Sequence, residues 1–232
     1  MNEVLTILPM PEQVTAAIID ALGTITAALL ASNYLAHIFK KSTYFTHYAA
    51  KTHNAGYLLR KAKSNIYFIA ACGNKFLFKY RKILESSMRN GRTINFLLLD
   101  KKNYSMLEQY INGRNYPDWK ALIDSLNILI ELKNTYTDKI NIRILNGLLT
   151  ASYIGIDIDE EYKSNGEIQI MIYQYNTHTK DSLITRIQRK RNKKEYENVA
   201  NNILDIWDMG NEVTICDLVS YLDQIQSIIG VL

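Results

Sequence analysis

The densest group of chemically similar side chains in this sequence is a basic run between positions 186 and 194. It consists of Arg186, Arg189, Lys190, Arg191, Lys193 and Lys194. Clustered cations bind phosphate groups, either those of nucleic acid, with a strong dependence on salt, or those of an anionic membrane leaflet. Lys101, Lys102 and Arg143 could belong to the same surface. The competing interpretation is a solvated linker that leads into a helix near residue 194.

Other reactive residue types are not arranged in the common catalytic or metal-binding patterns. The sequence has no glycine-rich nucleotide signature, no HExxH zinc motif and no G-x-S-x-G hydrolase motif. Its four histidines are not at metal-ligand spacing, and Cys72 and Cys216 form no CxxC pair. We therefore expect no metal and no cofactor. The formal net charge of +4 fits an anionic partner without requiring one.

Alternating hydrophobic periodicities predict that a layered α/β domain carries these groups. Expected strands cover residues 66–72, 93–100, 140–145, 148–158 and 167–175, and expected helices cover residues 74–89, 104–112, 118–135, 194–209 and 214–229. Asn74 is the predicted cap of the first helix, and Asn90 with Gly91 ends it. An acidic turn containing glycine joins the last two strands, which predicts a hairpin.

The order of these elements and several short phrases carry a resemblance to a known family. The phrases are NGRTINFLLLD, GLLTASYIGIDID and IQIMIYQY, followed by a late helix with Trp207. Over roughly residues 60–210 the chain resembles a phospholipase D-like domain, and it looks like the degenerate, noncatalytic branch found in membrane-associated bacterial anti-phage defence effectors. The resemblance implies a layered mixed sheet with flanking helices.

Catalytic members of that superfamily carry His-x-Lys-x4-Asp, in which the histidine attacks phosphorus and the lysine stabilises the phosphoryl oxygens. If Asp157 is placed on the family aspartate, the histidine and lysine positions fall on Thr150 and Ser152, which cannot do this chemistry. The resemblance therefore implies a site without catalysis. His178 and Lys180 form an alternative half match, but Thr185 stands where the motif requires an acid.

Residues 14–39 form an apolar stretch that is long enough, at about 1.5 Å per residue, to cross a hydrocarbon core of roughly 30 Å. Lys40 and Lys41 follow it, and the excess of basic residues on this side places the C-terminal part in the cytoplasm. We expect a single-pass protein of the inner (cytoplasmic) membrane, with an N-terminal segment and flank at residues 1–45 and an α/β domain at residues 46–232. A cleaved signal peptide is the competing interpretation.

The segment is polar for a simple anchor, and its small residues predict close packing of helices. Gly23, Ala27 and Ala31 form a packing stripe, while Asp20, Thr24, Asn33 and His37 are the candidate pore or interface residues. An acid within a membrane segment is costly unless it faces protein or water. The alternative is that Asp20 reaches the outer headgroups.

Three functions follow from these features. The first is a toxin-like effector whose soluble domain senses or docks a partner and controls oligomerisation of the N-terminal helix, which disrupts the inner membrane. The second is a membrane-tethered phosphodiesterase or nuclease that uses His178 and Lys180. The third is a membrane adaptor for a complex that contains nucleic acid. Expected partners are the membrane and either further copies of the chain or a regulatory protein, with nucleic acid bound directly or through that protein.

Overall fold

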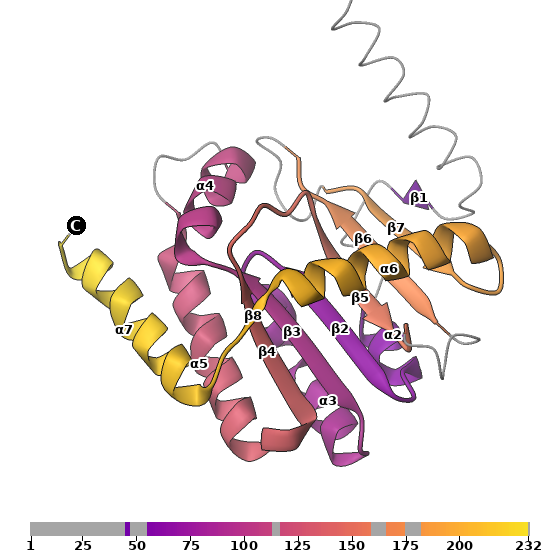
Figure 1. Cartoon of the computed structure of the whole chain (residues 1–232), viewed down its shortest axis with the longest axis horizontal. Coiled ribbons are helices and arrows are strands. Elements are labelled where there is room, and N and C mark those ends of the chain that lie inside the picture. The colour runs from indigo at the N-terminus through magenta and orange to yellow at the C-terminus, as the bar shows by residue number, and fades with distance from the viewer. Residues whose placement is uncertain (1–44, 47–54, 113–116, 159–165, 175–181, 232) are drawn as a thin grey trace, which may run out of the picture. The chain divides into compact units, whose positions relative to one another are not determined.

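The structure is a computed structural model, and it describes residues 45–46, 55–112, 117–158, 166–174 and 182–231 (Figure 1). The chain divides into two units, residues 1–43 and residues 44–232, and all of the described residues belong to the second. The expected membrane segment lies outside the described residues, as do Asp20, Gly23, Thr24, Ala27, Ala31, Asn33 and His37. Within the described ranges, no helix has both the length and the apolar character needed to span a membrane.

The described part of the chain contains a mixed sheet of eight strands in the order β1-β7-β6-β5-β2-β3-β4-β8. The strands are β1 (Phe45–Thr46), β2 (Asn65–Ala70), β3 (Thr93–Leu99), β4 (Ile140–Leu145), β5 (Ala151–Ile156), β6 (Glu167–Ile172), β7 (Ile184–Gln188) and β8 (Asn211–Glu212). Strands β2, β3 and β4 are parallel to one another, whereas the other neighbouring pairs are antiparallel. The pairing of β2 with β5 therefore joins a parallel half to an antiparallel half.

Helices cover both faces of this sheet. They are α2 (Ala55–Lys61), α3 (Asn74–Arg89), α4 (Lys101–Asn112), α5 (Trp119–Thr135), α6 (Lys193–Met209) and α7 (Ile215–Val231), and a short 3-10 helix, η1 (Thr137–Lys139), precedes β4. Figure 1 shows α6 crossing one face, with α3 and α5 behind the other and α7 packed along α5. The expected mixed sheet with flanking helices is confirmed.

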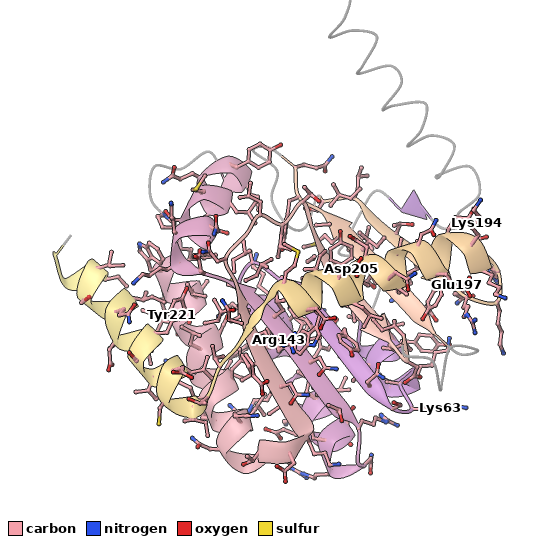
Figure 2. All side chains as sticks on the ribbon, in the orientation of Figure 1. Lys63, Arg143, Lys194, Glu197, Asp205 and Tyr221 are labelled. Atoms are coloured by element: carbon pink, nitrogen blue, oxygen red, sulfur yellow. The ribbon has the colours of Figure 1, made fainter. Side chains whose placement is uncertain are left out.

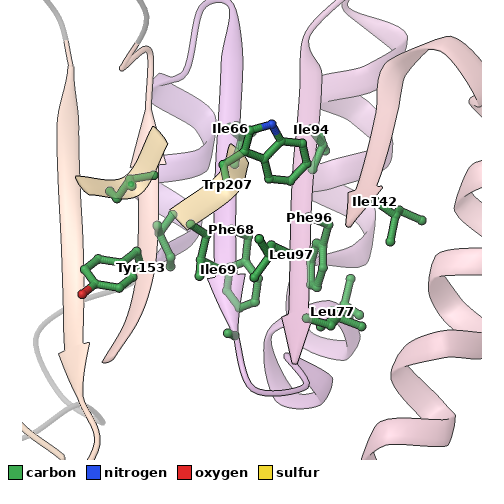
Figure 3. Packing of buried hydrophobic residues seen from close by; sticks show 14 of the residues in the cluster. Ile66, Phe68, Ile69, Leu77, Ile94, Phe96, Leu97, Ile142, Tyr153 and Trp207 are labelled. Atoms are coloured by element: carbon green, nitrogen blue, oxygen red, sulfur yellow. The ribbon is translucent and has the colours of Figure 1, made fainter. Parts of the chain in front are cut away.

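The central strands are buried at nearly every position because both faces are covered. On the α3 face, Phe68 stacks on Phe76 with ring centroids 3.9 Å apart and contacts Phe96 at 4.7 Å. On the α6 face, Trp207 meets the ring of Tyr67 edge-on at 5.7 Å. Figure 3 shows the packing of Trp207, Phe68 and Phe96 around β2 and β3. These aromatic contacts tie α3 and α6 to opposite faces of β2.

Some expected boundaries are confirmed and others are wrong. The helix over residues 74–89 has the predicted bounds, but its cap is Gly73 rather than Asn74. Gly73 has a φ of 71°, and a Cβ there would lie 2.8 Å from Phe68 Cε1. The tight turn over these rings accepts only glycine. The next helix begins at Lys101, earlier than expected, because Asp100 Oδ1 accepts the backbone N–H of Asn103 at 2.7 Å.

Strand β7 is missing from the elements expected from the sequence, which place a linker at the start of the basic run. Its sequence, Ile-Thr-Arg-Ile-Gln, is short and contains polar residues. It shows neither the strict alternation nor the continuous apolar run that predicts a strand. Pairing with β6 makes it a strand, from Glu167 opposite Gln188 to Met171 opposite Ile184. The predicted hairpin of β5 and β6 is confirmed by their antiparallel pairing.

Two glycines with positive φ provide a test of the turn before α3. Gly73→Ala should lower the free energy of unfolding of residues 44–232 by about 2–4 kcal/mol, since it combines a left-handed backbone with a clash against aromatic rings. Gly91 has a φ of 84°, and a Cβ at this position would meet no atom within 4 Å, so Gly91→Ala should cost only about 1 kcal/mol. Urea denaturation measures both variants, and equal losses would contradict the packing argument.

Candidate functional site

The three positions assigned to the family motif lie along β5, in the middle of the sheet. Thr150 directly precedes the strand, Ser152 lies within it, and Asp157 directly follows it. At about 3.3 Å per residue, the five residues from Ser152 to Asp157 span roughly 16 Å. The hydroxyl and carboxyl groups are therefore at opposite ends of one strand.

Asp157 holds the backbone that leads into β2. Its carboxylate accepts backbone N–H groups from Lys63 at 2.9 Å, Ser64 at 2.8 Å and Asn65 at 3.3 Å. The residue has no exposed surface and a φ of 51°. Its own backbone N–H donates to the Asn65 carbonyl at 3.0 Å. These contacts occupy the carboxylate and give it a structural role, which is compatible with the loss of the catalytic motif.

Ser152 belongs to a polar cluster at the carboxyl end of β2. The Tyr173 hydroxyl accepts the backbone N–H of Ala71 at 3.0 Å and also forms a hydrogen bond with Ser152. Next to it, the Tyr104 hydroxyl donates to the Asp118 carbonyl at 2.7 Å. The Cys72 thiol shares a hydrogen bond with the same tyrosine. The cluster brings together hydroxyl and thiol groups from four separate parts of the chain.

Burial keeps these groups protonated. It raises the pKa of the Cys72 thiol to about 11, and nearby Glu108 acts in the same direction. Burial also raises the pKa of Tyr104 and of Tyr173 far above the usual range of a phenol. A thiol or phenol without its anionic form is a poor nucleophile at neutral pH. The described residues at this end of β5 are therefore suited to packing rather than to attack on phosphorus.

The alternative catalytic pair, His178 and Lys180, lies outside the described residues, between β6 and β7 in the sequence. Thr185, five positions beyond Lys180, lies on β7 and is buried.

The basic run is divided by burial into two kinds of residue. Arg186 is mostly buried on β7, where its guanidinium donates to Gln169 Oε1 at 3.0 Å and lies 3.9 Å from Glu167 Oε1. Burial lowers its pKa, while Glu167 acts in the opposite direction. Arg189 forms an ion pair with Glu197 at 2.9 Å. Protein partners engage both guanidinium groups, and contact of Arg186 and Arg189 with phosphate stays a prediction.

The other four members of the run are exposed. Lys190 and Arg191 lie in the turn after β7, and Lys193 and Lys194 begin α6. Figure 2 shows Lys194 at the outer end of that helix. Lysine and arginine side chains in water are cationic at neutral pH. These side chains can therefore reach an anionic surface.

Lys101, Lys102 and Arg143 do not extend this surface. The Lys101 ammonium donates to Gln224 Oε1 of α7 at 2.7 Å, at the opposite end of the sheet. Arg143 lies on β4, with its guanidinium 4.7 Å from the Trp207 ring centroid. It also donates to the Trp207 carbonyl at 2.8 Å. Arg143 therefore anchors α6 on the sheet, and the expectation that it joins the basic run is wrong.

Two groups of interacting residues were not anticipated. One is the cluster of Cys72, Tyr104 and Tyr173, whose members share no sequence spacing. The other is the carboxylate of Glu167, whose side chain is 2% exposed and accepts from Lys61 Nζ at 2.7 Å. The only sequence signal for it is an acid at the start of an apolar strand. Both groups form through contacts between elements that lie far apart in the sequence.

No protein-family model and no curated protein sequence matches the chain. Among solved structures, the described fold resembles phosphatidylserine synthase from Haemophilus influenzae Rd KW20, with a TM-score of 0.50 and 11% sequence identity. The match covers 80% of this chain and 43% of that one, so the chain spans less than half of the synthase. The synthase belongs to the phospholipase D superfamily, and the likeness indicates a phospholipase D-like fold without evidence on activity.

A second similar structure is TrmBL2, an archaeal chromatin protein whose structure shows a novel mode of DNA binding. Its TM-score is 0.47 and its identity 11%, over 88% of this chain and 72% of that chain. A likeness at this level does not establish a shared fold.

The role of Asp157 can be measured by substitution. Asp157→Ala should lower the free energy of unfolding by about 3–5 kcal/mol, because it leaves several backbone N–H groups without an acceptor. Asp157→Asn keeps one acceptor oxygen and tolerates the left-handed backbone, so its loss should be smaller. Chemical denaturation of residues 44–232 provides the comparison. An alanine variant within about 1 kcal/mol of wild type would contradict a structural role.

The raised pKa of Cys72 predicts unequal thiol reactivity. At pH 8 a thiol of pKa about 11 is ionised to about one part in a thousand, so Cys72 should react slowly with a disulfide reagent. Cys216 is exposed and should react first. Stopped-flow thiol titration of the folded protein, with Cys216→Ser as the control that isolates Cys72, measures both rates. Fast labelling of Cys72 would contradict the assigned environment.

Proposed function

We propose that the chain is a membrane-anchored, toxin-like effector with a noncatalytic phospholipase D-like domain. In this proposal the domain senses or docks a partner and controls oligomerisation of the N-terminal helix at residues 14–39, which then disrupts the inner membrane, as part of bacterial anti-phage defence. The noncatalytic part of the proposal is supported by the residues found at the three positions assigned to the family motif. Thr150 and Ser152 lack the required chemistry, and the Asp157 carboxylate is engaged by backbone.

The attachment of the domain to the N-terminal segment supports a controlling role. Strand β1 pairs with β7 through Phe45 opposite Thr185 and Thr46 opposite Ile184. Only residues 40–44 separate the apolar segment from this strand in the sequence. A partner that shifts β7 would therefore act on a strand that closely follows the segment. Oligomerisation itself is inferred from the small and polar residues of the segment.

The runner-up is a membrane-tethered phosphodiesterase that uses His178 and Lys180. It is favoured by the fold likeness to phosphatidylserine synthase, whose name denotes phospholipid chemistry. It is weakened by the missing acid of the motif, because Thr185 stands at that position. An adaptor for a nucleic-acid complex would use the exposed lysines of the basic run and is compatible with the effector proposal.

Membrane depolarisation in cells that express the full chain tests the proposal. The full chain should depolarise, whereas a fragment beginning at Tyr44, which keeps β1 intact, should not. Asp20→Leu should abolish the effect, because it removes the acid proposed to face protein or water within the membrane. Glu12→Leu is the matched control, since it removes an acid just before the segment, and it should behave like wild type.

Two outcomes would redirect the assignment. If the full chain leaves the membrane potential intact, the pore proposal is wrong. If the purified chain then cleaves a phosphodiester substrate and His178→Ala abolishes cleavage, the phosphodiesterase alternative replaces it. Cleavage that survives His178→Ala would exclude that residue as the nucleophile.

A further inference from the structure

Exposed cations from two separate segments of the chain, residues 60–63 and 190–194, gather at one end of the sheet. We call this surface the basic end, and it comprises Arg60, Lys61, Lys63, Lys190, Arg191, Lys193 and Lys194. The strand pairing explains the grouping, because β2 starts, β5 ends, β6 starts and β7 ends at this end. The ion pair of Lys61 with Glu167 links the α2 side to β6 at 2.7 Å. Figure 2 shows Lys63 and Lys194 on the same side of the molecule.

Most of the acidic residues described near this end form hydrogen bonds or ion pairs within the domain. Glu167 lies between Lys61 and Arg186, and Glu197 pairs with Arg189. Asp157 is enclosed by backbone N–H groups. The connection between β5 and β6, outside the described residues, contributes Asp159, Glu160 and Glu161 in the sequence. A test of this surface must therefore measure the reactivity of individual lysines rather than the effect of the net charge.

The pairing of β1 with β7 sets the direction in which β1 runs. Phe45 pairs with Thr185, and the following residue, Thr46, pairs with Ile184. Because the strands are antiparallel, the N-terminal end of β1 points toward Arg186 and the end of β7. The six steps from residue 39 to Phe45 reach roughly 20 Å at most, even when fully extended. The N-terminal end of β1 is therefore directed toward the end of the sheet that carries the exposed cations.

We propose that the basic end docks the domain on the anionic headgroups of the membrane that holds the N-terminal segment. This proposal rests on the proposed membrane anchoring and specifies the partner of the basic surface. Lysine and arginine side chains are attracted to an anionic leaflet, and salt screens this attraction beyond about 10 Å. The direction of β1 favours lipid over nucleic acid as the occupant, since the strand end that leads back to the apolar segment is directed toward the cations.

Lysine footprinting of the full chain tests the docking. The chain is reconstituted in vesicles of phosphatidylcholine alone or of equal parts phosphatidylcholine and phosphatidylglycerol, treated briefly with an amine-acetylating reagent and analysed by mass spectrometry. Lys63, Lys190, Lys193 and Lys194 should react several-fold more slowly on the anionic vesicles, and high salt should remove the difference. Lys75, Lys79 and Lys82 are exposed on α3 and should react equally on both.

A pair of charge-matched variants separates docking from general electrostatics. Combined Lys190→Gln, Lys193→Gln and Lys194→Gln should remove the protection of Lys63 on anionic vesicles. Combined Lys75→Gln, Lys79→Gln and Lys82→Gln lowers the net charge equally and should leave that protection in place. Loss of protection in both variants, or in neither, would overturn the proposal.

The remaining outcomes distinguish this inference from the function on which it rests. A chain retained on both vesicle types with equal lysine reactivity would overturn headgroup docking while leaving anchoring intact. A chain retained on neither type would overturn anchoring itself. Protection of the same lysines by duplex DNA, without protection by anionic vesicles, would identify nucleic acid as the occupant and refute the proposal.

Discussion

The hydrogen bonds of the Asp157 carboxylate close one end of the β2–β5 pair, at which the two halves of the sheet meet. Asp157 follows β5, which begins the antiparallel half, and its oxygens accept N–H groups from Lys63, Ser64 and Asn65, which lead into the parallel half. The ladder between these strands begins at Ile66 opposite Ile156, so the preceding donors depend on this side chain. A buried donor without an acceptor is costly. The path from α2 into β2, and with it the position of Lys63, therefore depends on one carboxylate.

The same contacts give the Asp157 carboxylate a structural role within this fold. The carboxylate of Asp157, the position assigned to the family aspartate, accepts backbone N–H groups, and Thr150 and Ser152 occupy the other two assigned positions. At the other end of β5, burial keeps the Cys72 thiol and the Tyr104 phenol protonated. A fold supports many functions, since function lies in particular sites. Here Asp157, Cys72 and Tyr104 interact with partners inside the domain, whereas the cations of the basic end are exposed.

Burial also divides a basic run that is uniform in the sequence. Arg186 and Arg189 are held by Gln169, Glu167 and Glu197. The lysines that follow are in a turn and at the start of a helix, where nothing requires them to be buried. A guanidinium that is already paired gains little from a second anion, whereas an exposed ammonium retains its full attraction. The exposed cations therefore comprise only part of the run, and Lys63, from a distant segment, lies at the same end of the sheet.

Local elements with a strong periodicity could be predicted from the amino-acid order alone. The helix over residues 74–89 and the strand over residues 140–145 have their predicted bounds, because hydrophobic spacing and Asn90-Gly91 act within a few residues. Strand β7 could not be predicted in this way, since its short, polar sequence becomes regular only through pairing with β6. The folded chain likewise set the partners of Asp157 and the location of Lys63 at the same end of the sheet as Lys190. Those contacts depend on backbone donors and charges that lie far apart in the chain, and sequence spacing carries no information about them.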